Sequence, residues 1–140
     1  MRVPSVLSIT APTDALVDTT SDQTDGNKAF TAGNWAVKCN AANGATVRLT
    51  AQSPFTNGTS ERDAQLDLSI ASGNPTWSVG TATDSTDYAT SVDTAEVTAS
   101  SSKPGAGQLA LTVTFINTTY ADLTQGDYVM TVQGTISANP

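Results

Sequence analysis

The residues that could carry chemistry in this sequence are few, and the types that most catalytic sites need are missing. The chain has no histidine and one cysteine, so it lacks the base of a Ser-His-Asp or Cys-His site and the usual ligands of zinc. That residue, Cys39, shares the alternation phase of Trp35 and Val37, which predicts a small buried side chain rather than a nucleophile. One cysteine also excludes a disulfide within the chain.

The glutamates do not indicate catalysis either. A glycoside hydrolase needs two carboxyl groups across a cleft, one of them with a raised pKa. The only glutamates, Glu61 and Glu96, stand beside polar residues on the expected outer faces of strands. The glycine-containing segments lack the strand-loop-helix context of a phosphate-binding loop. We therefore expect a protein that is not an enzyme and that needs no cofactor.

Four aspartates gather in the polar segment 11–33, for which we expect a long acidic loop. They are Asp14, Asp18, Asp22 and Asp25. The stretch D-Q-T-D-G-N resembles part of a calcium loop, but it lacks the full set of alternating oxygen ligands and the closing glutamate. We expect no metal site here. Long loops in compact domains are usually functional or held by a partner, so the four aspartates are candidate partner contacts.

Alternating apolar residues predict the strands that position these side chains. Two long strands between residues 108 and 139 are expected to form the central hairpin, with one face buried. The inward residues of this pair are Leu109, Leu111, Val113, Phe115, Tyr128, Met130 and Val132. A second hairpin is expected to join Asn34–Asn40 to Gly44–Ala51 through the turn A-A-N-G, with Trp35, Val37 and Cys39 facing in and Val47 and Leu49 across from them. Leu66, Leu68 and Ile70 mark a further buried face.

About eight such strands at short intervals predict an all-β fold in which residues 1–140 form a single domain. The 24 threonines favour strands as well, because β-branched side chains suit a pleated surface. We expect an antiparallel β-sandwich, either immunoglobulin-like or jelly-roll. Residues 1–10 are expected to form an N-terminal arm or edge strand, because Pro4 lacks a ladder donor. The candidate partner contacts in this arm are Val3, Pro4, Val6, Leu7 and Ile9.

The charge of the chain excludes two classes of partner. Six basic and thirteen acidic residues give a net charge of −7, and the basic residues are scattered along the sequence. We therefore expect binding neither to nucleic acid nor to an anionic membrane. Charged residues make up 14% of the chain, against roughly a quarter in an average soluble domain. Small, weakly charged outer faces are typical of a structural protein that packs against copies of itself or a scaffold.

The end of the chain, L-T-Q-G-D-Y-V-M-T-V-Q-G-T-I-S-A-N, resembles the last strands of immunoglobulin-like surface and pilin domains, in which a Gly-Asp-Tyr turn precedes the final strand. This resemblance implies a sandwich fold rather than a role. Pilins of the spore-coat-U type also have a signal peptide and usually a disulfide, and this sequence shows neither. Residues 1–14 lack the apolar run of a secretory signal, so we expect synthesis in a cytoplasm. A signal removed ahead of Met1 is the alternative.

A Thr/Ala/Ser-rich, cysteine-poor sandwich of this size is also similar to the decoration or cement proteins of tailed-phage capsids. That similarity implies a virion protein at the capsid surface, bound to the major capsid protein or to copies of itself, often as a homo-oligomer. The first alternative is an extracellular fibre or pilus subunit that donates Val3–Thr10 to the sheet of a neighbour. The second is a carbohydrate-binding module that uses Trp77 and Tyr88.

Overall fold

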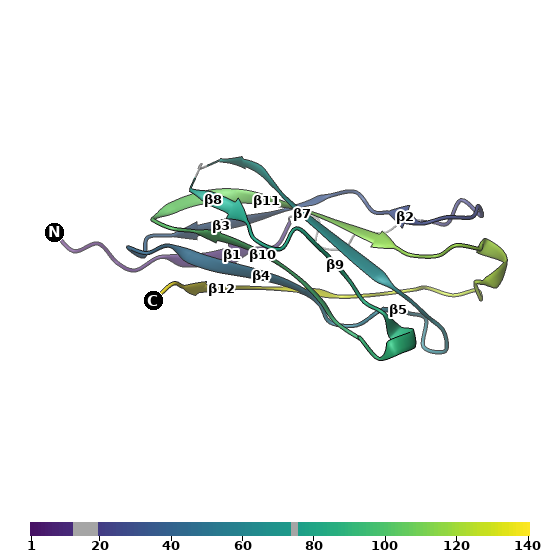
Figure 1. Cartoon of the computed structure of the whole chain (residues 1–140). Helices are drawn as coiled ribbons and strands as arrows, with labels where there is room; N and C mark the ends of the chain where they lie inside the picture. Colours follow the sequence, from purple (N-terminus) through teal and green to yellow (C-terminus); the bar gives the residue numbers. More distant parts are fainter. Residues whose placement is uncertain (13–19, 74–75) are drawn as a thin grey trace.

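Two antiparallel sheets packed face to face form the body of the chain (Figure 1). The computed structural model describes residues 1–12, 20–73 and 76–140. The larger sheet has the order β1 (Leu7–Thr10), β3 (Gly33–Cys39), β11 (Gly105–Phe115), β7 (Ala64–Gly73), β9 (Thr83–Ser85), and β2 (Lys28–Ala29) pairs with the end of β11. The smaller has the order β12 (Val132–Ala138), β4 (Ala45–Ala51), β10 (Ala95–Ser101), β8 (Trp77–Val79).

The prediction of an all-β, antiparallel sandwich is therefore confirmed. A third small sheet pairs β5 (Phe55–Thr56) with β6 (Glu61–Arg62), and the only helical segments of the described residues are the single turns η1 (Tyr88–Thr90) and η2 (Tyr120–Asp122). The described part has twelve strands rather than about eight. The additional ones, β2, β5, β6 and β9, are two or three residues long, too short for alternation to mark them.

Both predicted hairpins are wrong, because the strands concerned belong to different sheets. β3 lies in the larger sheet and β4 in the smaller, so Val37 and Leu49 face each other across the core instead of pairing along a ladder. β11 and β12 are separated in the same way. Alternation of apolar residues identifies the buried face of each strand. It does not identify the neighbour of the strand, because the same alternation occurs in strands that pair within one sheet and in strands of two sheets that face each other across a core.

The connection between β3 and β4 depends on Gly44. Its amide donates to the carbonyl of Ala41 over 3.0 Å, closing a turn, and its φ is +76°. A Cβ at this position would collide with the backbone carbonyl of Ser101 on β10. The Asn-Gly pair thus makes the tight turn that its sequence predicts, but the turn leads from one sheet to the other.

The core lies between the sheets, where the inward residues have the predicted phase. Leu66, Leu109, Val47, Leu49 and Val97 are each fully buried. Cys39 is 3% exposed, as expected for a small core side chain. Ile70 differs from the prediction and is 36% exposed. It lies beside an irregularity in the β7–β11 register, and a bulge of this kind twists the strand locally and turns its side chains.

An aromatic cluster extends this core toward the end of the sandwich that lies away from both termini (Figure 1). Phe55 stacks on Phe30 with ring centroids 5.6 Å apart, and it meets the edge of Phe115 at 5.2 Å. Phe115 in turn contacts Tyr128 at 5.4 Å. Edge-to-face and offset pairs at these distances stabilise a structure by about 0.5 to 1.5 kcal/mol each beyond area burial. The cluster thereby joins the loops around β2 and β5 to the strand ends.

Candidate interaction surface

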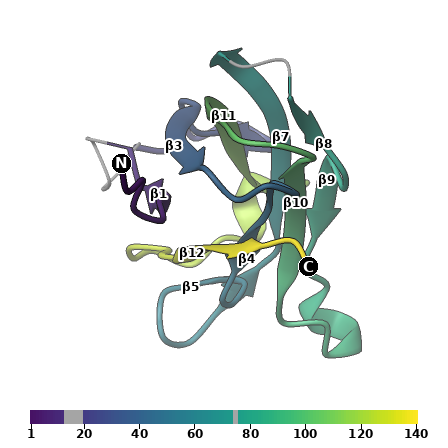
Figure 2. The same ribbon diagram turned by 90° about the vertical axis from the view of Figure 1, so that its left-hand side faces the viewer.

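The N-terminal strand forms one edge of the larger sheet. Within the described ranges 1–12, 20–73 and 76–140, β1 pairs with β3 alone, in the register Leu7↔Cys39 to Thr10↔Ala36. Figure 2 shows β1 at the margin of the sandwich, and Figure 1 shows the segment before it extending past the ends of the other strands. A strand with a free edge presents unpaired backbone donors and acceptors, so this margin is able to bind a further strand.

Asn40 holds the residues that precede β1. Its side-chain oxygen accepts a hydrogen bond from the amide of Val6 at 2.7 Å, and its side-chain nitrogen donates to the carbonyl of Pro4 at 2.7 Å. Its backbone amide donates to the carbonyl of Val6 at 3.0 Å. This role is not visible in the sequence, because an asparagine that binds backbone 34 positions away cannot be told from one in a turn.

The five candidate contacts of the arm divide into two groups. Val3 is 68% exposed and Leu7 is 40% exposed, Pro4 is also exposed, and Val6 is half-buried. Ile9 instead packs against the core. It reaches toward β12, where a Cβ on Gly134 would lie 3.0 Å from the Ile9 Cδ1 atom and 2.6 Å from the ring of Trp35. Ile9 therefore anchors the strand, and Val3 and Leu7 are left as exposed apolar side chains.

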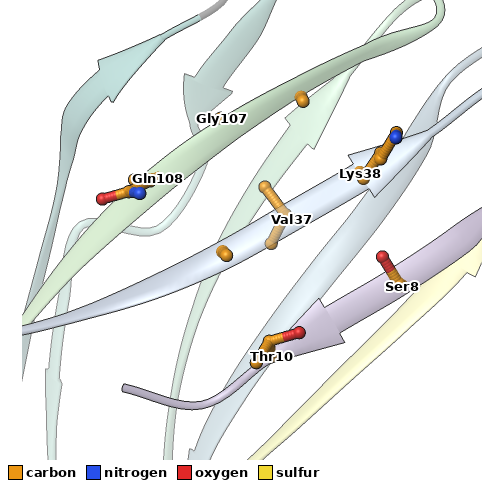
Figure 3. A pocket seen from close by; sticks show the side chains of 8 residues that line it. Ser8, Thr10, Val37, Lys38, Gly107 and Gln108 are labelled. Carbon is orange, nitrogen blue, oxygen red and sulfur yellow. The ribbon is translucent and has the colours of Figure 1, made fainter. Parts of the chain in front are cut away.

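A shallow hollow of about 430 Å³ lies beside this edge, on the strands β1, β3 and β11 (Figure 3). The residues that line it are Ser8, Thr10, Ala36, Val37, Lys38, Ala106, Gly107 and Gln108. Two rows of the ladder form the hollow. In one row the short side chain of Ala36 lies between Thr10 and Gln108. In the other row Lys38 lies between Ser8 and Ala106. Lys38 is the only charged group in the lining. The hollow offers hydroxyls, an amide and one ammonium group, which can form hydrogen bonds to a polar surface.

The outer face of the smaller sheet is also built from small polar side chains. The residues of its outward phase include Thr46, Arg48, Thr50, Glu96, Thr98, Ser100, Gln133, Thr135 and Ser137. Arg48 and Glu96 form an ion pair at 2.8 Å, and Thr50 donates to the same carboxylate at 3.3 Å. The face thus carries paired charges among hydroxyl groups. Glu96 is engaged in this pair rather than in a carboxylate dyad.

The acidic loop uses its described aspartates within the chain. Asp22 forms an ion pair with Lys28 at 3.0 Å and accepts a hydrogen bond from the Thr24 hydroxyl at 2.7 Å. The Thr24 hydroxyl first, and Lys28 after it, lower the pKa of Asp22 from 3.8 to about 2. Asp25 accepts a hydrogen bond from the backbone amide of Tyr120 at 2.8 Å, and this bond connects the loop to η2.

The structure does not show the four candidate aspartates gathered in one site. Asp22 and Asp25 have separate partners, and Asp14 and Asp18 lie outside the described residues. Within the ranges 1–12, 20–73 and 76–140, no three acidic, histidine or cysteine side chains gather where they could hold a metal ion.

The two aromatic residues of the carbohydrate alternative differ in exposure. Trp77 is 4% exposed and belongs to the core, so its ring offers no open face to a sugar. Tyr88, on η1, is 38% exposed. The indole nitrogen of Trp77 is the one buried side-chain polar atom without a hydrogen-bond partner in the described part of the chain.

Comparison with family models, with curated proteins and with solved structures finds no match to this chain. The described residues also contain no helix long and apolar enough to cross a bilayer. The class of the protein therefore follows from its fold alone, which is an antiparallel β-sandwich with a free N-terminal edge.

Proposed function

We propose that this chain is a structural subunit without catalytic activity, and that it decorates or cements a viral capsid by binding across the joints between capsid proteins. The observation that carries the proposal is the free edge of β1 together with the exposed apolar side chains of Val3 and Leu7. Monomeric proteins usually protect such edges with charges, bulges or a covering segment. Among the described residues, β1 carries no charged side chain and no further segment covers its edge, which favours a protein that assembles.

The composition of the outer faces supports the same function. Threonine, serine, alanine and glutamine side chains are short, so two flat faces that carry them can approach closely and lose little side-chain entropy. The paired charges of Arg48 and Glu96 leave no unmatched ion on the face of the smaller sheet that they share. The proposal includes the major capsid protein and copies of this chain as partners, with the capsid surface as the location.

Strand donation in a fibre or pilus is the weaker candidate. β1 already pairs with β3 of its own chain through four residue pairs, and Ile9 is packed against the core. Donating this strand to a neighbour would break those contacts and expose the edge of β3. Decoration needs no such rearrangement.

The test is a binding experiment with undecorated shells assembled from the major capsid protein that the proposal names as partner. We expect the purified chain to sediment with undecorated shells and to raise the temperature or the guanidinium concentration at which they open. A chain lacking residues 1–6 should bind less, while Asp122→Asn, a change in an exposed turn away from the edge, should bind as the wild type does. Failure of the wild-type chain to bind shells would refute the capsid role.

A further inference from the structure

We infer that two copies of this chain pair through β1, antiparallel about a two-fold axis at Val6, so that their larger sheets join into one continuous sheet. This inference rests on the proposed structural role and specifies one of its contacts. The occupant of the free edge is then the same edge of a second copy, an isologous contact that closes after two subunits.

The backbone groups of β1 are arranged for such a pairing. The amide of Asn40 donates to the carbonyl of Val6, and the amide of Val6 is held by the Asn40 side chain. Val6 therefore faces β3, and in an antiparallel ladder so do Ser8 and Thr10, two and four residues on. The amides and carbonyls of Leu7 and Ile9 must point the other way, out of the sheet. If the same alternation continues toward the N-terminus, the amides and carbonyls of Ser5 and Val3 also point out of the sheet.

Pro4 does not weaken this edge. A proline usually protects an edge strand because it lacks the amide donor. Pro4 has the phase of Val6, so the missing donor falls on the side toward β3, where the Pro4 carbonyl is already bound by Asn40. The outward row of donors is therefore complete from Val3 to Ile9.

The side chains also match under the two-fold axis. With the axis at Val6, Val3 of one copy lies opposite Ile9 of the other, and Ser5 lies opposite Leu7. The odd-numbered side chains share the face on which Ile9 packs into the core. The overhanging Val3, 68% exposed in the single chain, would then cover the margin of the partner's core beside Ile9. Pro4 falls in a non-hydrogen-bonded pair, where no amide is needed.

Charge favours this margin over the rest of the surface. Each chain has a net charge of −7, so two copies repel each other at most orientations. Residues 1–12 contain no acidic side chain and one basic side chain, Arg2, and the neighbouring strands β3 and β12 contain no acidic side chain either. Among the residues that the structure describes, the β1 margin is thus a place where two acidic copies meet without facing carboxylates.

The first test uses a cysteine at the axis. Val6→Cys, in a Cys39→Ala background, places two sulfur-bearing residues in a non-hydrogen-bonded pair with Cα atoms about 4.5 Å apart, within the range that a disulfide spans. We expect a disulfide-linked dimer to form under mild oxidation. Ser8→Cys in the same background is the matched control, because its counterpart under the axis is Pro4 and its own copy lies about 13 Å away along the strand. Cross-linking of Ser8→Cys as fast as Val6→Cys would overturn the inference.

The second test removes one outward amide. Ser5→Pro should leave the fold of the single chain unchanged, because that amide faces solvent, and should weaken dimerisation at least about tenfold in analytical ultracentrifugation. Ser5→Ala keeps the amide and should dimerise as the wild type does. Equal dimerisation of the two variants would refute the β1 contact. If the wild-type chain stays monomeric but stabilises shells, the β1 pairing is refuted and the proposed function stands. If Val6→Cys cross-links as expected but the wild-type chain does not bind shells, the proposed function is refuted and the pairing stands.

Discussion

Replacing Asn40 by alanine should release the N-terminal arm without unfolding the sandwich. The substitution removes two side-chain hydrogen bonds, to the amide of Val6 and to the carbonyl of Pro4, both at 2.7 Å. A hydrogen bond of this kind stabilises a structure by about 0.5 to 1.5 kcal/mol net, so the pair should hold the arm by about 1 to 3 kcal/mol. Every 1.4 kcal/mol is about a factor of ten in an equilibrium constant, so the amide of Val6 should exchange with solvent about 5 to 150 times faster.

Hydrogen exchange followed by NMR would measure this change residue by residue. The amides of the core strands should keep their protection, since the side-chain hydrogen bonds of Asn40 go to the arm and Asn40 follows the last residue of β3. Asn43→Ala is the matched control, because Asn43 binds a carbonyl of the other terminus, that of Pro140, at 2.9 Å. It should leave exchange at Val6 unchanged. Unaltered exchange at Val6 in Asn40→Ala would refute the account of how the arm is held.

Three further predictions concern the core, a turn and the acidic loop. Leu49→Ala, at a position with no exposure, should lower the free energy of unfolding by about 2 to 5 kcal/mol, measured by urea denaturation. Gly44→Ala should lower the melting temperature much more than Gly58→Ala. Both glycines have positive φ, but of the two only Gly44 lies where a Cβ would collide with backbone atoms. Equal losses of melting temperature would contradict the proposed clash. Asp22 titrates at about 2 in the folded chain against an ordinary 3.8, so the stability it contributes is complete above the ordinary pKa and is lost as the pH falls through about 2. Thr24→Val should raise the pKa of Asp22 toward its ordinary value in an NMR titration, and an unchanged pKa would exclude the hydroxyl as the main cause.

The sequence predicted which faces are buried better than it predicted which strands are neighbours. Leu109, Leu66 and Val97 lie inside as their alternation requires, because each residue's burial depends on the two-residue period of its own strand. The partner of a strand depends on the path of the whole chain. For that reason the expected hairpin partners of β3 and β11 were wrong although the buried phases of both strands were right.

The candidate site was predictable in part. Pro4 and the short apolar run after it indicated an arm or edge strand, and β1 is an edge strand of the larger sheet. The role of Asn40 was not predictable, because it joins backbone groups brought together only by the fold. The hollow over Ala36 was missed for a similar reason: it depends on the pairing of β3 with β11, which places the short side chains of Ala36 and Ala106 in adjacent rows of the same face.

The separation of successive strands between the sheets also determines when this protein can fold during its synthesis. In the larger sheet, the pairs β1–β3 and β7–β9 are joined only by β11, the last of its strands in the chain. β11 reaches Phe115, so the two halves of that sheet have no common partner until more than three quarters of the chain has been made. A fold dominated by such distant pairings forms slowly. The emerging chain therefore exposes unpaired strand edges until late in translation, the stage at which such edges are most prone to aggregation.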